Sequence, residues 1–266
     1  MSQHDWFIFP THPHLPPPDW PALSQRLIDT GILLPADGQH IAPEDLRELS
    51  SELAIHGQTS WVDIDPSWRT TADVVDAYRA SSEAIARLSL APGLSMADTV
   101  ATMREQGFAF QFWPSSDAER CAWGGTRHRL GDAAAALFDD KDEWVREANA
   151  LSFSLLAYAG SPNVTAGENL CAPLRPGTDE PLELMAPFGT HVDFIGAAYE
   201  DPAVTWTDPD TGKSFHIFDL DWSQSLGLGY RFLKIEGGWH ADFFERLRAH
   251  LAGLLGQPMT ISHQHL

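Results

Sequence analysis

The chain contains little cysteine, and its few thiols narrow the classes of protein to which it can belong. Its 266 residues include two cysteines, Cys121 and Cys171, which form no CxxC pair. Neither a disulfide framework nor a cysteine-based zinc site is therefore indicated. No apolar run approaches the roughly 18 residues that would span a bilayer, and the first residues lack the basic start of a secretion signal. We expect a cytoplasmic protein without a membrane segment.

Lysine is equally scarce, and this shortage makes the chain strongly acidic. The only lysines are Lys141, Lys213 and Lys234, and 37 acidic residues against 17 lysines and arginines give a formal net charge of −20. Such a charge repels phosphate groups, so binding to nucleic acid or to an anionic membrane is disfavoured. It attracts basic proteins and metal ions instead.

Sequence motifs of enzymes are also missing. The chain has no GxSxG nucleophile elbow and no SxxK pair. Its glycine pairs at 124–125 and 227–229 lack the strand–GxGxxG–helix context of a nucleotide site. These absences favour a binding protein over an enzyme, and no cofactor is predicted.

One short pattern supports an alternative function. His191 and Asp193 lie in a run that resembles a strand, and alternate residues of a strand share a face. With His216 or His240 as a third ligand they would form the facial triad of an Fe(II)/2-oxoglutarate oxygenase. The resemblance is limited to this HxD pattern, because His240 stands at the head of the last helix rather than on a late strand.

The first half of the chain is predicted to contain one strand followed by helices. An apolar run at 5–9 predicts the strand, and a proline-rich turn at 10–18 ends it. The helix that follows Thr70 is expected to continue through Leu88, because its apolar residues keep a helical spacing. Capping residues or proline predict helix starts near Asp19, Pro43, Thr70, Ser95 and Asp140.

The second half is predicted to be richer in strands. The pattern at 182–222 is typical of strands, and Asp208 to Lys213 has the composition of a hairpin turn. A helix after Gly238 is expected to end at Gly256, with an edge strand at 259–262. Because strands and helices are grouped rather than alternating, we predict an α+β fold with a mixed or antiparallel sheet.

A stretch rich in proline and glycine at 160–181 leaves the domain organisation open. It is either a long loop within a single domain of residues 1–266 or the link between two lobes, 1–159 and 182–266.

Acidic residues next to tryptophans occur in two places. Carboxylates steer a basic partner and aromatic side chains anchor it, so this combination is typical of a protein-binding surface. Charge runs also serve simply to solvate turns and helix starts. The residues that we predict to contact a partner are Trp61, Asp63, Asp65, Trp68, Asp219, Asp221 and Trp222.

The acidic composition, the α+β layout and the segment from Trp239 to Leu247 in the last helix resemble the immunity proteins of polymorphic and type VI secreted toxins. In length and layout, the chain is most similar to the immunity proteins that pair with toxins of the restriction-endonuclease fold. The resemblance implies a bacterial cytoplasmic protein that binds a cognate toxin and blocks its active site or its assembly. A nuclease presents positive charge around its cleft, which a chain of charge −20 would complement.

Overall fold

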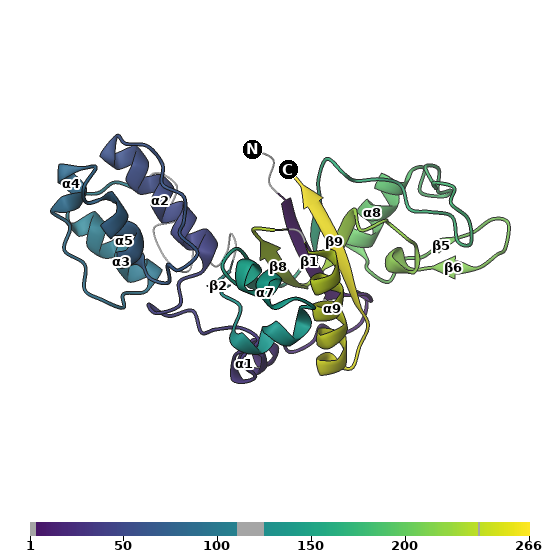
Figure 1. The fold of residues 1–266 in the computed structure, drawn as a ribbon. Helices are drawn as coiled ribbons and strands as arrows, with labels where there is room; N and C mark the ends of the chain where they lie inside the picture. Colours follow the sequence, from purple (N-terminus) through teal and green to yellow (C-terminus); the bar gives the residue numbers. More distant parts are fainter. Residues whose placement is uncertain (1–3, 111–124, 239) are drawn as a thin grey trace. The chain divides into compact units, whose positions relative to one another are not determined.

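The computed structural model describes residues 4–110, 125–238 and 240–266, and it has an α+β fold as predicted (Figure 1). Cys121 lies outside the described residues, and Cys171 is an exposed free thiol. The helices are α1 (Trp20–Asp29), α2 (Pro43–Gly57), α3 (Thr71–Tyr78), α4 (Glu83–Ala86), α5 (Met96–Glu105), α7 (Lys141–Ala148), α8 (His191–Glu200), α9 (Ala241–Leu255) and the 3-10 helices η1 (Asp132–Leu137) and η2 (Ile217–Asp219). The strands are β1 (His4–Pro10), β2 (Arg127–His128), β3 (Ser152–Ala157), β4 (Asn163–Ala166), β5 (Trp206–Thr207), β6 (Ser214–Phe215), β7 (Leu226–Gly229), β8 (Arg231–Glu236) and β9 (Met259–His265).

The chain divides into two compact units whose bounds differ from the two predicted lobes. Unit 1 comprises Met1–Leu23, Leu155–Lys234 and His240–Leu266, and unit 2 comprises Ser24–Ser154 and Ile235–Trp239. The first strand joins the C-terminal residues because β1 pairs with β9. The stretch at 160–181 therefore lies inside unit 1 and does not link two lobes.

The main sheet has the strand order β2-β3-β8-β1-β9, and two smaller sheets pair β4 with β7 and β5 with β6. Strands β1 and β9 are antiparallel, in a register from His4 opposite His265 to Pro10 opposite Met259. Trp6 to Phe9 are all buried. Burial on both faces of β1 explains why this strand has a continuous apolar run instead of an alternating pattern.

Capping residues begin several helices where the sequence predicts them. Thr70 and Asp73 form a capping box at the start of α3, and the Asp140 side chain accepts a hydrogen bond from Asp142 N at the start of α7. The helix after Thr70 is shorter than expected. It ends at Tyr78, and Leu88 follows the separate helix α4.

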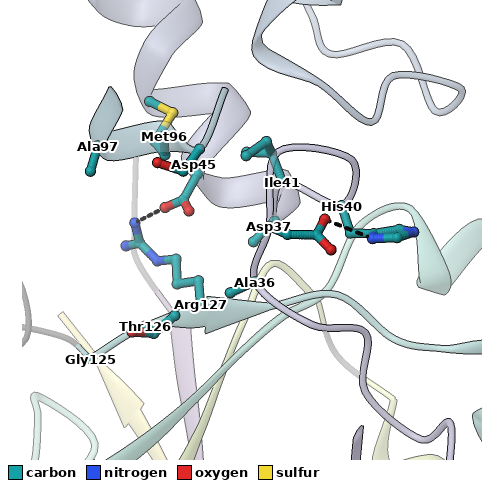
Figure 2. Close-up of a pocket in the computed structure, with 12 residues that line it drawn as sticks. Ala36, Asp37, His40, Ile41, Asp45, Met96, Ala97, Gly125, Thr126 and Arg127 are labelled. Atoms are coloured by element: carbon teal, nitrogen blue, oxygen red, sulfur yellow. Dashed lines mark hydrogen bonds and ion pairs between the residues drawn. The ribbon is translucent and has the colours of Figure 1, made fainter. Parts of the chain in front are cut away.

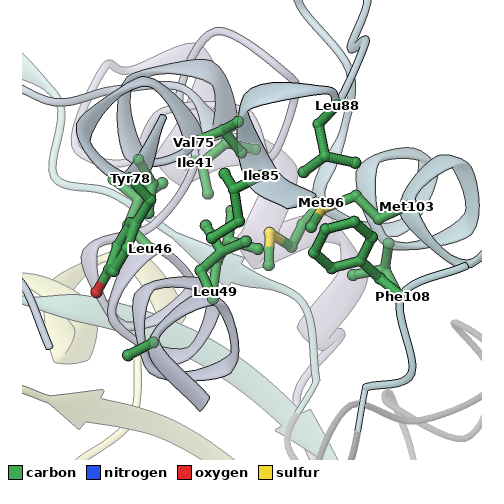
Figure 3. Packing of buried hydrophobic residues seen from close by; sticks show 14 residues of the cluster. Ile41, Leu46, Leu49, Val75, Tyr78, Ile85, Leu88, Met96, Met103 and Phe108 are labelled. Carbon is green, nitrogen blue, oxygen red and sulfur yellow. The ribbon is translucent and has the colours of Figure 1, made fainter. Parts of the chain in front are cut away.

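The core of unit 2 lies between helices α2, α3, α4 and α5 (Figure 3). Leu46 and Leu49 of α2 pack with Val75 and Tyr78 of α3, and all four are fully buried. The Tyr78 hydroxyl forms a 2.8 Å hydrogen bond with Ser50 Oγ, so the one polar atom at this end of the ring has a partner. In unit 1 a separate core surrounds α8 and the β4–β7 pair.

The prediction of strands across 182–222 is wrong for most of that segment. Residues 191–200 form α8, whose Thr190 and Asp193 make a complete capping box, and Phe194, Ile195 and Ala198 cover its buried side. The predicted hairpin is confirmed, because β5 and β6 pair on either side of the 208–213 turn. The last helix is also confirmed: α9 ends at Leu255 and is capped by Gly256, which has a φ of 68°.

Within the described ranges, no helix combines the length and the apolar character that crossing a membrane requires.

Candidate functional site

The first predicted acidic segment, from Trp61 to Asp65, lies along the surface of unit 2. Val62 and Ile64 pack against the core of the helices, whereas Trp61, Asp63 and Asp65 point away from it and are exposed. Trp61 is 50% exposed. The alternation of an extended chain therefore places one aromatic ring and two carboxylates in a single row.

Two buried hydroxyl groups hold this segment in place. Ser50 Oγ donates to Val62 O at 2.8 Å, and Val62 N donates to the Tyr78 hydroxyl oxygen at 2.9 Å. Because both hydroxyls come from helices of the core, the backbone beneath the exposed row is anchored to a packed scaffold. A rigid support of this kind reduces the entropy that an interface loses on binding.

The two carboxylates of the row differ in their surroundings. Asp65 accepts hydrogen bonds from Ser67 N at 2.8 Å and from Ser67 Oγ at 2.6 Å. These hydrogen bonds lower the pKa of the Asp65 carboxyl, so it keeps its negative charge in mildly acidic solution. Asp63 makes no hydrogen bond or ion pair with the described part of the chain, and its carboxylate faces solvent.

Trp68, the second predicted anchor in this segment, contributes less surface. Its ring is half-buried against the helix core of unit 2. Its carbonyl oxygen accepts hydrogen bonds from Arg69 Nη1 at 2.8 Å and from Arg129 Nη1 at 3.2 Å. Trp61 is therefore the stronger candidate for an aromatic anchor on this surface.

The second predicted cluster, at 219–222 in unit 1, is only partly on the surface. Asp219 and Asp221 are exposed, and each accepts a backbone hydrogen bond, from His216 N at 2.8 Å and from Ser223 N at 2.7 Å. Trp222 is 3% exposed, and its Nε1 donates to Ile217 O at 2.6 Å. The prediction that Trp222 anchors a partner is thus wrong, because the ring belongs to the core.

A hollow of about 280 Å³ lies next to Asp221 in unit 1. Its lining includes the apolar side chains of Leu226 and Ile261 together with Glu245 and Arg248. Arg248 Nε donates to Glu245 Oε2 at 2.7 Å, so this cation is already paired with a carboxylate of its own helix. The hollow adds a concave surface beside the acidic residues, which the sequence did not reveal.

Sequence reasoning also missed a pocket of about 220 Å³ in unit 2, which is lined by residues from the 36–42 loop, α2, α5 and β2 (Figure 2). Arg127 points into it and forms ion pairs with Asp45 at 2.9 Å, with Glu48 at 2.8 Å and with Glu236 at 2.8 Å. No local sequence pattern connects these residues, because the hydrogen-bonded pairs are separated by 79 to 109 positions.

Arg127 and Glu48 shift each other's pKa values. Burial raises the pKa of the Glu48 carboxyl above its ordinary value, although Arg127 pulls it in the opposite direction. Burial by itself would lower the pKa of Arg127, but its hydrogen bonds to Glu236 and the three neighbouring carboxylates raise it instead. The guanidinium group therefore remains charged, and it links β2 to α2 and to Glu236 within unit 2.

The iron site predicted at His191 and Asp193 is not formed. Both residues lie in α8, where side chains two positions apart diverge by about 200°, and Asp193 Oδ2 is occupied by hydrogen bonds from Thr190 N and Thr190 Oγ1. His216 precedes η2 and His240 caps α9. Across residues 4–110, 125–238 and 240–266, no group of three or more His, Cys, Asp or Glu side chains is placed to hold a metal ion.

Three histidines instead stack at one end of the β1–β9 pair. The rings of His4 and His265 are 4.5 Å apart between centroids, and His4 Nδ1 lies 2.9 Å from His263 Nε2. Burial and the two neighbouring rings lower the pKa of His263 below its ordinary value, although Asp5 opposes them. The stack is therefore favoured when the imidazole of His263 is neutral.

Comparison of the chain with protein-family models, with curated proteins and with solved structures gives no match. The candidate surfaces therefore have to be judged by their geometry and charge.

Proposed function

We propose that this chain is an immunity protein, which binds a basic secreted toxin in the cytoplasm and blocks it without catalysing a reaction. The observation that carries the proposal is the exposed row of Trp61, Asp63 and Asp65 on a chain of net charge −20. A half-exposed tryptophan held on a packed scaffold supplies an anchor that loses little entropy on binding. Carboxylates beside it favour a partner that carries lysine and arginine.

The same charge suggests how the toxin would be inhibited. A nuclease gathers positive charge around the cleft that receives phosphate groups, and an acidic protein is drawn to that cleft at a rate that depends on ionic strength. Once bound, the acidic protein competes with nucleic acid for the same cations. Asp219 and Asp221 of unit 1 provide a second acidic surface for such a contact.

The proposal is tested by identifying the partner and then changing the row. The native full-length chain is used as bait at low ionic strength, bound proteins are released with a salt step, and the partner is identified by mass spectrometry. We expect one basic toxin. Co-production of this chain is then expected to restore the growth of cells that express that toxin.

Variants locate the contact. The affinity for the purified toxin is measured for Trp61→Ala, for Asp63→Lys and for Glu105→Lys, in which an exposed carboxylate at the end of α5 is reversed as a matched control. Trp61→Ala and Asp63→Lys are expected to weaken binding by tenfold or more, and Asp63→Lys to flatten its salt dependence, while Glu105→Lys has a small effect. Absence of any basic partner, or affinity that is indifferent to salt and to both row variants, would refute the proposal.

A further inference from the structure

Helix α8 of unit 1, which is labelled in Figure 1, has exposed apolar side chains on one side. Val192 and Tyr199 are 54% and 43% exposed, and Gly196 lies between them on the same side of the helix. Leu184, whose backbone bridges to Thr190 just before α8, is 79% exposed. We refer to Leu184, Val192, Gly196 and Tyr199 as the α8 stripe. The opposite side of the helix is buried in the core of unit 1.

Gly196 is not required by the fold. A Cβ atom at this position would meet nothing within 4 Å, and its φ is not positive. Glycine inside a helix is destabilising relative to alanine, so the residue weakens α8 without relieving any clash among the described residues. Its effect is a notch between Val192 and Tyr199, at which the backbone of another molecule can approach closely.

Two acidic residues lie beside the α8 stripe. Asp193 and Glu200 each follow an apolar member of the stripe by one position, and both side chains are exposed. Hydrogen bonds from Thr190 lower the pKa of Asp193, so its carboxylate is charged at neutral pH. The segment 183–201 contains no lysine or arginine, so α8 and its flanking residues contribute only acidic charges at neutral pH.

We infer that the α8 stripe binds a cationic amphipathic helix of the partner protein. Within the stripe, the helical residues Val192, Gly196 and Tyr199 follow i, i+4, i+7 spacing over about 10 Å of helix axis. A second helix could pack along this line with its ridges in the grooves of α8. Leucine or aromatic side chains of that helix would cover Val192 and Tyr199 at the notch of Gly196. Its lysines or arginines would face Asp193 and Glu200. The inference rests on the proposed function, from which it takes the basic character of the partner. It adds that the partner binds the α8 stripe through an amphipathic helix.

The test uses two synthetic 18-residue peptides of identical composition. One places leucines along one helical face with lysines beside them, and the other scrambles the same residues so that no apolar face forms. Binding of each labelled peptide to the full chain is followed by fluorescence anisotropy at 150 mM salt. We expect the patterned peptide to bind at least tenfold more tightly than the scrambled one.

A matched pair of variants locates the peptide. Gly196→Arg fills the notch and adds a positive charge, and Gly253→Arg makes the same change at an exposed glycine of α9 where a Cβ also meets nothing within 4 Å. Circular dichroism and urea unfolding show whether both variants are folded, and Val192→Ser gives a second, milder perturbation of the stripe. We expect Gly196→Arg to weaken binding at least tenfold and Gly253→Arg to change it less than twofold.

Three results would overturn the inference. The scrambled peptide binding as tightly as the patterned one would show general charge attraction, and equal effects of the two arginine variants would place the peptide elsewhere. A dimer of the wild-type chain that Gly196→Arg dissociates would show that the α8 stripe binds a second copy. If the captured toxin binds Gly196→Arg normally, the inference fails while the proposed function stands; if no toxin exists, the proposed function fails whatever the peptides do.

Discussion

Replacing Arg127 by methionine is expected to destabilise unit 2 strongly. The substitution keeps most of the apolar stem and removes the guanidinium from Asp45, Glu48 and Glu236, whose carboxylates lie within 2.9 Å of it. Removing one partner of a buried ion pair costs about 3–5 kcal/mol because the other charge is left without compensation. The Glu48 side chain is 40% exposed, so most of this loss comes from Asp45 and Glu236, which are 5% and 6% exposed.

The loss is measured by urea unfolding at pH 7, followed by circular dichroism. For a chain of this size about 3–5 kcal/mol corresponds to a fall in Tm of roughly 6–20 °C. Glu48→Gln serves as a control and is expected to cost less than about 1 kcal/mol, because the Glu48 side chain is 40% exposed to solvent. Adding Glu236→Gln to Arg127→Met should recover part of the loss, since it removes one of the uncompensated charges.

The pH dependence of Arg127→Met provides a second check. Without the guanidinium, burial acts unopposed on the Glu48 carboxyl and raises its pKa in the folded state further above the unfolded value. The folded variant then binds more protons than the unfolded one, so its deficit relative to the wild type should shrink as the pH falls from 7 to 5. A loss below about 1 kcal/mol at pH 7, with a pH profile parallel to that of the wild type, would refute this account of the Arg127 cluster.

Three further changes test other features of the fold. Thr190→Ala removes the capping box with Asp193, and we expect urea unfolding to show a loss of about 1 kcal/mol; an unchanged midpoint would contradict this role. Gly237→Ala should be strongly destabilising in a thermal melt, because Gly237 has a φ of +105° and its Cβ would lie 2.2 Å from Ala150 O; wild-type stability would be the contrary result. The pKa of His263 is lowered in the folded state, so the unfolded chain binds more protons than the folded chain. The contribution of His263 to stability is therefore lost as the pH falls below about 6.5. Unfolding at pH 7.5 and 5.5 should therefore show a smaller loss for His263→Gln than for the wild type, and equal losses would count against the stack.

Local signals in the sequence were sufficient to predict several helices and one hairpin of this fold. A capping residue acts within one helical turn, so Thr70 and Asp140 mark the starts of α3 and α7 without reference to the rest of the chain. The composition of the 208–213 turn likewise determines the hairpin between β5 and β6. These predictions succeed because the interactions that determine these elements join residues only a few positions apart in the sequence.

Most of the errors arise where distant residues decide, but one local signal was overlooked. The apolar residues between 182 and 222 suggest strands, yet the Thr190–Asp193 capping box begins a helix over 191–200, whose buried side includes Phe194 and Ile195. The sequence likewise places Trp222 beside two acids but contains no sign of the core that covers it. The ligands of Arg127 come from α2 and β8, which no local pattern connects with β2. Of the predicted partner residues, the exposed ones are Trp61, Asp63, Asp65, Asp219 and Asp221.

The pairing of β1 with β9 sets the order in which the chain can mature on the ribosome. Strand β1 lies between β8 and β9 in the main sheet, so neither neighbouring strand is available to it until residues 231–265 have been synthesised. At about 5–20 residues per second this wait lasts from about ten seconds to about a minute. Throughout that time the apolar strand from Trp6 to Phe9 is available to chaperones and to other nascent chains, whereas residues 24–154 of unit 2 are complete much earlier. Late closure of unit 1 is therefore the step at which translation speed and chaperone supply would govern the yield of folded protein.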